Sequence, residues 1–178
     1  MTPRRIAAAA LLVLATAAVY WPALHGGFIF DDEPLVSKSA IVRAADGLSR
    51  IWFSTEPIDY WPVTNSSFWL EWRLWGMNPT GYHVTNLALH IANALLIWAL
   101  LRRLSVPGAW IAAMVFALHP VNVESAAWIA QRKNTLSLFF GLLASLSFLD
   151  SKRSYWASIG LFIAAMLSKG SVVVLTAM

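Results

Sequence analysis

Long apolar runs, several of them flanked by paired basic residues, dominate this sequence. A helix needs about 20 residues to cross ~30 Å of hydrocarbon, because each residue advances it by 1.5 Å. About five and a half runs fit this pattern, the third of them short. Their ranges are 6–24, 82–101, 107–118, 134–149, 155–167 and 171–178. We therefore expect an all-α, polytopic bundle of transmembrane helices.

Composition supports a membrane protein and excludes several other classes. Only 12% of the residues are charged and 58% are hydrophobic, whereas roughly 25% of a typical soluble domain is charged. The chain has no cysteine, which excludes a disulfide scaffold and a thiolate metal site. Its 13 lysines and arginines are scattered along the chain and form no basic stripe. We therefore expect a lipid bilayer as partner and no nucleic acid.

The basic pairs predict the orientation of the helices. If the spans alternate, six basic residues fall on one side, which the positive-inside tendency makes cytoplasmic. The domains expected are a first transmembrane helix in 1–25 with a cytoplasmic N-terminus, an extracytoplasmic loop in 26–81, and helices two to five with the start of a sixth in 82–178. The basic start also fits a cleavable secretory signal. The six residues are Arg4, Arg5, Arg102, Arg103, Lys152 and Arg153.

The loop in 26–81 is rich in tryptophan. Six of the ten tryptophans lie between Trp21 and Trp75. Two stretches in it, 40–53 and 65–75, have the amphipathic pattern of short helices that lie in the headgroup plane. We expect them to form interfacial helices at the outer surface.

Two clusters of polar residues interrupt the apolar pattern near the outer boundary. The adjacent carboxylates Asp31 and Asp32 repel, so at least one should have a raised pKa and suit a general base. The alternative is a solvated acidic turn before Pro34. In the second span, four polar residues share about 80° of arc, and their alternative role is hydrogen bonding between helices. These four are His83, Asn86, His90 and Asn93.

Three cations lie on the outer side, against the positive-inside tendency. They are Arg132 and Lys133, which follow the stretch 119–125, and Lys169. Cations at an outer bilayer edge suit a phosphate, which arginine can bind through two parallel hydrogen bonds. The alternative is ordinary snorkelling of long side chains to lipid headgroups. In the same stretch, Glu124 and Gln131 are seven residues apart and would share one helix face.

Taken in order, these motifs resemble the membrane half of the transmembrane and tetratricopeptide-repeat O-mannosyltransferases and their bacterial relatives. The resemblance runs from about residue 28 to the end of the sequence. Its motifs are FIFDD at 28–32, YWPVT at 60–64, GYHVTNL at 81–87, LH at 89–90, FALHPVNVES at 116–125, RK at 132–133 and LSK at 167–169.

The resemblance implies a C-type glycosyltransferase fold with a large first extracytoplasmic loop that carries an acidic motif. It implies transfer of a sugar, such as mannose, from a polyprenyl-phosphate donor to a hydroxyl acceptor, either protein Ser/Thr or a glycan, with inversion. No cofactor is required, and a divalent metal is neither indicated nor excluded. The expected location is the inner membrane of a bacterium, with the site facing the periplasm or exterior. Because the sequence stops inside the sixth run, we expect a fragment of a longer protein.

The resemblance also implies roles for single residues. Asp31 or Asp32 would take the proton of the acceptor hydroxyl, and Asp31 aligns with the leading acid of related pairs. Arg132, Lys133 and Lys169 would hold the departing polyprenyl phosphate. Three further side chains would orient sugar hydroxyls or the acid pair: His83, His119 and Glu124.

Two other classes of function fit parts of the pattern. One is a catalytically silent membrane module that binds lipid-linked sugar or anchors a repeat domain. The other is a transporter, but transporters place polar groups at mid-membrane in matched halves, whereas these groups crowd one boundary. The sequence therefore favours a glycosyltransferase acting at the extracytoplasmic face.

Overall fold

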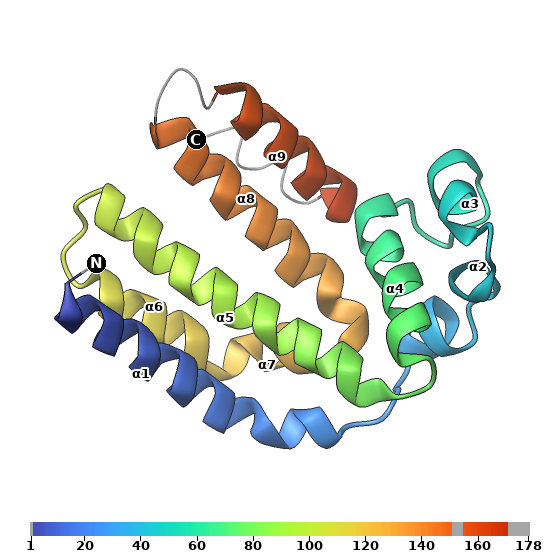
Figure 1. Ribbon diagram of the computed structural model, residues 1–178, viewed down its shortest axis with the longest axis horizontal. Coiled ribbons are helices and arrows are strands. Elements are labelled where there is room, and N and C mark those ends of the chain that lie inside the picture. Colours follow the sequence, from blue (N-terminus) through green and yellow to red (C-terminus); the bar gives the residue numbers. More distant parts are fainter. Residues whose placement is uncertain (1, 151–154, 171–178) are drawn as a thin grey trace.

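The computed structural model describes residues 2–150 and 155–170. Within those ranges the chain forms helices and turns and contains no strand, which confirms the all-α prediction. Five helices pack side by side, and the helices of the segment 26–81 lie at one end of them (Figure 1). The five are α1 (Pro3–Tyr20), α5 (Pro79–Arg103), α6 (Ala109–Leu118), α8 (Arg132–Asp150) and α9 (Tyr155–Ser168).

Two helices of the described part are long and apolar enough to cross a membrane. One is α1 with the 3-10 turn that continues it to His25, a stretch of 23 residues, and the other is α5, with 25 residues. The apolar helices α6 and α9 are shorter, at 10 and 14 residues. Further spans at α6, α8 and α9 therefore remain predictions. The sixth predicted run, 171–178, lies outside the described residues.

Small side chains let the long helices approach one another. Ala94 of α5 and Ala113 and Ala117 of α6 are fully buried, and they pack with Leu12 of α1 and with Trp98. Alanine at a helix contact brings backbones close and gives dispersion contacts, which drive packing where the surroundings are apolar. The core of this part of the bundle is therefore built on alanine, with Trp98 filling the larger space.

The polar face of α5 points inward, as expected from its spacing. All four of its polar side chains are buried, and three of them reach main-chain carbonyl oxygens of other segments. The distances are 2.8 Å for Asn86 and Asn93 and 3.0 Å for His90. These three residues therefore join segments through hydrogen bonds, which is the alternative role that the sequence left open. His83, the fourth, has a different environment that is described with the site.

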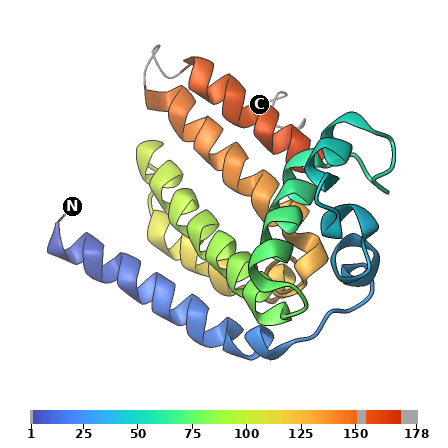
Figure 2. The same ribbon diagram turned by 45° about the vertical axis from the view of Figure 1, so that its right-hand side comes forward.

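The loop helices differ in detail from their prediction. The predicted helix 40–53 is split into α2 (Ala40–Arg43) and α3 (Gly47–Phe53). The predicted helix 65–75 begins earlier, as α4 (Pro62–Trp75). Proline suits a first helical position because that N–H has no partner within the helix. Figures 1 and 2 show α4 crossing the end of the bundle where α5 begins and α9 ends.

Gly47 is a point of close contact between α3 and α2. A Cβ there would overlap the carbonyl oxygen of Ile41 and lie 2.9 Å from Cδ1 of Trp69. We expect Gly47→Ala to lower the free energy of unfolding by about 1–3 kcal/mol, the usual range for overpacking. Unfolding followed by tryptophan fluorescence measures this loss. Gly27→Ala is the matched control, because a Cβ at Gly27 meets nothing within 4 Å, and equal stability of the two variants would contradict the expectation.

Candidate functional site

The acidic motif docks on a break between two helices. The helix α7 (Val123–Ala127) ends at Trp128, whose φ and ψ of −87° and 125° are extended, and the chain re-enters helical structure before α8. The break frees the N–H of Ala130, which donates to Oδ1 of Asp32 at 2.7 Å. Oδ2 of Asp32 accepts the N–H of Ile29 at 3.0 Å. The ring of Phe30 packs edge-on against Trp128, with centroids 6.2 Å apart, so the motif is fixed against this break.

The two adjacent acids have opposite environments. Asp32 is fully buried, and both of its oxygens accept main-chain N–H groups. Burial raises the pKa of the Asp32 carboxyl, and the hydrogen bonds from Ile29 and Ala130 oppose that rise. Asp31 is exposed, and its carbonyl accepts the N–H of Leu35 at 3.1 Å. The raised pKa thus falls on Asp32 and comes from burial rather than from repulsion, while Asp31 is the solvent-exposed acid of the pair.

Arg132 is the best-satisfied cation of the site. Its side chain is fully buried, and Nη1 pairs with the carboxylate of Glu71 on α4. Nε donates to Oδ1 of Asn86 at 2.7 Å, and Nη2 donates to the carbonyl of Tyr82 at 2.9 Å. One guanidinium therefore joins α4, α5 and α8, which places this predicted phosphate ligand inside the protein.

Glu71 is a residue of the site that the sequence did not single out. Only 6% of its surface is exposed. Burial raises the pKa of its carboxyl, and the charge of Arg132 opposes that rise. The sequence gives little indication of this role, because Glu71 is a single acid within an amphipathic stretch.

A chain of hydrogen bonds joins two predicted site residues. Nζ of Lys169 donates to Oδ1 of Asn134 at 2.5 Å, Nδ2 of Asn134 donates to Oε1 of Gln131 at 2.6 Å, and Nε2 of Gln131 donates to Oε1 of Glu124 at 2.6 Å. An ammonium can only donate and a carboxylate can only accept. The two ends therefore fix the orientation of both amides, and Lys169 and Glu124 belong to one polar network.

The other three predicted residues make no hydrogen bond with this network in the described part of the chain. The ammonium of Lys133 is 4.4 Å from the ring centroid of Trp61. His83 is 5% exposed, and neither of its ring nitrogens has a hydrogen-bond partner in the described part of the chain. His119 is exposed, and its Nδ1 accepts the N–H of Val121 at 3.1 Å, a local bond that caps the turn after α6. Roles for these residues toward a substrate remain predictions.

The candidate site residues and the basic pair that ends α5 lie at opposite ends of the bundle. The acidic motif, Arg132 and Lys169 lie at the end where α8 begins and α9 ends, whereas Arg102 and Arg103 close the other end of α5. There, Nη2 of Arg103 pairs with Asp150 at 2.8 Å. Among the described residues, no three His, Asp or Glu side chains are placed to hold a metal ion.

The curated proteins that this chain resembles are named protein O-mannosyl-transferases. The chain is 30% identical over 176 residues to protein O-mannosyl-transferase F38B6.6 of Caenorhabditis elegans, across 89% of this chain and 26% of that protein. It is 33% identical over 155 residues to protein O-mannosyl-transferase TMTC1 of Mus musculus, across 79% of this chain and 16% of that protein. It is 30% identical to TMTC3 of Mus musculus over 153 residues, 80% of this chain and 17% of that protein.

The chain thus spans about a quarter or less of the length of these curated relatives. No family model matches it, and no solved structure matches it. These relatives confirm the family resemblance that the sequence motifs indicated from residue 28 onward. Over most of its length, this chain is therefore a relative of the protein O-mannosyl-transferases of the TMTC kind.

Proposed function

We propose that this chain is part of a membrane glycosyltransferase that moves a sugar from a polyprenyl-phosphate donor to a hydroxyl acceptor at the extracytoplasmic face. Mannose and a protein Ser/Thr acceptor are the natural assignments, given the names of the relatives. The observation that carries the proposal is the docking of the acidic motif on the α7–α8 break. It fixes Asp32, the neighbour of Asp31, against the segment that supplies Glu124, Arg132 and Lys133.

The proposed reaction is a single displacement. The acceptor oxygen bonds to the anomeric carbon, the bond from that carbon to the phosphate oxygen breaks, and the configuration inverts. The proton of the acceptor hydroxyl passes to Asp31, whose exposed carboxylate can meet a hydroxyl group. Asp32 holds the motif in place through its two N–H bonds. The electron pair of the broken bond leaves on the polyprenyl phosphate.

The leaving phosphate needs positive charge at the same boundary. Lys133 and Lys169 are the cations that we assign to it. The ammonium of Lys169 uses one donor on Asn134, which leaves two N–H groups for phosphate oxygens. Arg132 contributes by fixing the start of α8, the helix that carries Lys133, because its guanidinium is taken up by Glu71, Asn86 and Tyr82.

Removal of the Lys169 charge tests the donor site. We expect Lys169→Met to weaken binding of a polyprenyl phosphate by about tenfold to a hundredfold, the value of one charged hydrogen bond. Titration of the full-length protein in detergent with the lipid phosphate measures the Kd. The matched control is Arg4→Met, in the first turn of α1 at the opposite end of the bundle, where we expect no change.

The same titration separates the two classes of function. Equal binding by Lys169→Met and the wild type would contradict the donor site. Donor binding without transfer to any hydroxyl acceptor would favour the catalytically silent module. Transfer of labelled sugar by the full-length protein in liposomes supports the enzyme.

A further inference from the structure

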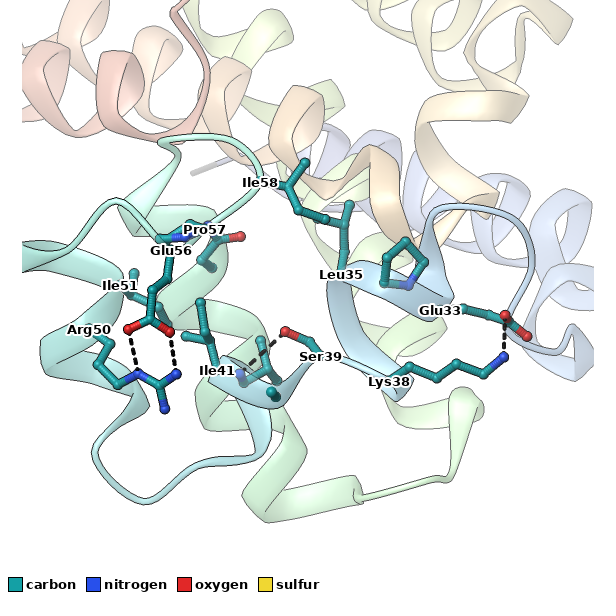
Figure 3. Close-up of a pocket in the computed structure, with 14 residues that line it drawn as sticks. Glu33, Leu35, Lys38, Ser39, Ile41, Arg50, Ile51, Glu56, Pro57 and Ile58 are labelled. Atoms are coloured by element: carbon teal, nitrogen blue, oxygen red, sulfur yellow. Dashed lines mark hydrogen bonds and ion pairs between the residues drawn. The ribbon is translucent and has the colours of Figure 1, made fainter.

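A groove in the outer loop has no role in the proposed chemistry so far. It is a cavity of about 550 Å³ between the π-helical turn Glu33–Ser37, α2, α3 and the segment 56–58 (Figure 3). Ligand pockets in proteins hold roughly 300–1,000 Å³, so the groove is of the size that binds a small ligand or part of a chain. Its apolar lining includes Leu35, Ile41, Val42, Ile51, Pro57 and Ile58.

Two ion pairs flank the apolar lining. On one side Nζ of Lys38 lies 2.7 Å from Oε2 of Glu33, and on the other Nε of Arg50 donates to Oε1 of Glu56 at 3.1 Å (Figure 3). The side chains of Lys38 and Glu33 are 70% and 48% exposed. Charged groups with that exposure are costly in hydrocarbon, so the groove opens to water. A water-facing groove with an apolar lining does not suit a lipid tail, which is more stable in the bilayer.

The groove lies next to the acid that we assign as the base. Leu35 lines it, and the N–H of Leu35 donates to the carbonyl of Asp31 at 3.1 Å. Asp31 is therefore about one helical turn from the groove. Glu33, two residues after Asp31, also lines the groove, so the groove begins close to the acidic motif.

Polar groups of the groove suit a peptide main chain. Asn65 lines the groove and is 7% exposed, and its Nδ2 donates to the carbonyl of Asp59 at 3.3 Å. Its Oδ1 is the amide atom that can accept a peptide N–H. The hydroxyl of Ser39 accepts the N–H of Val42 at 3.4 Å, and its own hydrogen can be donated to a peptide carbonyl.

We propose that this groove binds the acceptor as an extended, uncharged peptide segment, with apolar side chains against Leu35, Ile41 and Ile58 and a Ser or Thr hydroxyl at Asp31. This proposal rests on the proposed transferase function. It assigns acceptor binding to the first outer loop and donor binding to the start of α8 and the end of α9.

The test uses peptide binding to the full-length protein in detergent, read by fluorescence anisotropy. The probe is a short uncharged peptide with a central Thr flanked by Val and Leu, and a second peptide carries Gly in place of the flanking residues. We expect Ile58→Asp to weaken binding of the first peptide by roughly tenfold or more, since it puts a charge in an apolar contact. Ile58 is 71% exposed, so the change should leave the fold intact.

Phe53→Asp is the matched control. Phe53 lies in the same loop, is 88% exposed and does not line the groove, so we expect this variant to bind the peptide as the wild type does. The Kd for the polyprenyl phosphate should be the same in all three proteins.

The outcomes distinguish the proposal that the groove binds the acceptor from the proposal that the protein is a transferase. Equal losses in Ile58→Asp and Phe53→Asp, or equal binding of both peptides, would overturn the groove as acceptor site. Failure of the wild type to bind the peptide while it still binds and transfers from the donor would overturn the groove alone. Peptide binding that depends on Ile58 in a protein without transfer would support the groove and overturn the transferase.

Discussion

Replacement of Asp31 by asparagine is expected to lower kcat for sugar transfer by about a hundredfold to ten-thousandfold, the usual contribution of a general base. Asparagine keeps the size of the side chain and cannot take the proton. Because Asp31 is exposed, the unfolding temperature and the Kd for the polyprenyl phosphate should not change. Steady-state transfer by the full-length protein, measured with the donor titration, separates kcat from binding.

Asp32→Asn should have a different signature. Asparagine would turn an NH₂ group toward one of the two N–H donors that Asp32 now accepts, those of Ile29 and Ala130. A lost buried hydrogen bond of this kind costs about 1–3 kcal/mol, so we expect lower stability together with lower activity. Asp46→Asn, in an exposed acid of the same loop, is the control for both variants. Full activity in Asp31→Asn would show that Asp31 is not the general base.

Arg132→Met is expected to destabilise the protein by about 3–5 kcal/mol, because it leaves the buried carboxylate of Glu71 without its partner. The same guanidinium also satisfies Oδ1 of Asn86 and the carbonyl of Tyr82. Denaturant unfolding of the purified protein in detergent measures the loss. Arg43→Met is the matched control, since Arg43 is exposed and lies 5.1 Å from the ring centroid of Trp72.

The double variant Glu71→Met, Arg132→Met should recover much of that loss. With both charges removed, no unpaired ion remains in the interior, and apolar side chains of similar size can fill the space. The difference between the double variant and the sum of the single variants gives the coupling energy. Additive effects, or a loss in Arg132→Met as small as in Arg43→Met, would contradict the role of this ion pair.

Periodicity predicted the elements of this fold well. The all-helical architecture, the apolar helices α1 and α5 and the inward polar face of α5 follow from spacing and composition, which are local properties. The split of 40–53 into α2 and α3 was missed because hydrophobic spacing continues through the turn. There the N–H of Gly47 bonds to the carbonyl of Ala44, a turn that amphipathic periodicity does not encode.

The sequence singled out candidate site residues, but it did not predict their long-range pairings. That Asp31 and Asp32 separate into an exposed and a buried acid depends on Ala130, 98 residues away from Asp32. That Arg132 is taken up inside the protein depends on Glu71, 61 residues away. Such pairings follow from packing of distant segments, which residue spacing along one helix cannot supply.

Glu124 and Gln131 show that two residues can be neighbours without the regular helix that their spacing suggests. If the stretch were one continuous helix, their spacing of seven residues would place both on a shared face. The helix breaks at Trp128, and yet the two side chains bond at 2.6 Å. The short 3-10 turn Ile129–Gln131 returns the chain to a position from which Gln131 reaches Glu124. The two residues are therefore neighbours, as a continuous helix would also have made them, but the cause is a turn rather than helical spacing.

The stereochemistry of transfer tests the central claim most directly. The full-length protein is incubated in liposomes with a polyprenyl-phosphate mannose of one defined anomer and a peptide that contains Thr, and the anomer of the glycopeptide is read by NMR. A single displacement with Asp31 as base predicts product of the opposite anomer only. Product of the same anomer, or release of free sugar with no glycopeptide, would contradict the account.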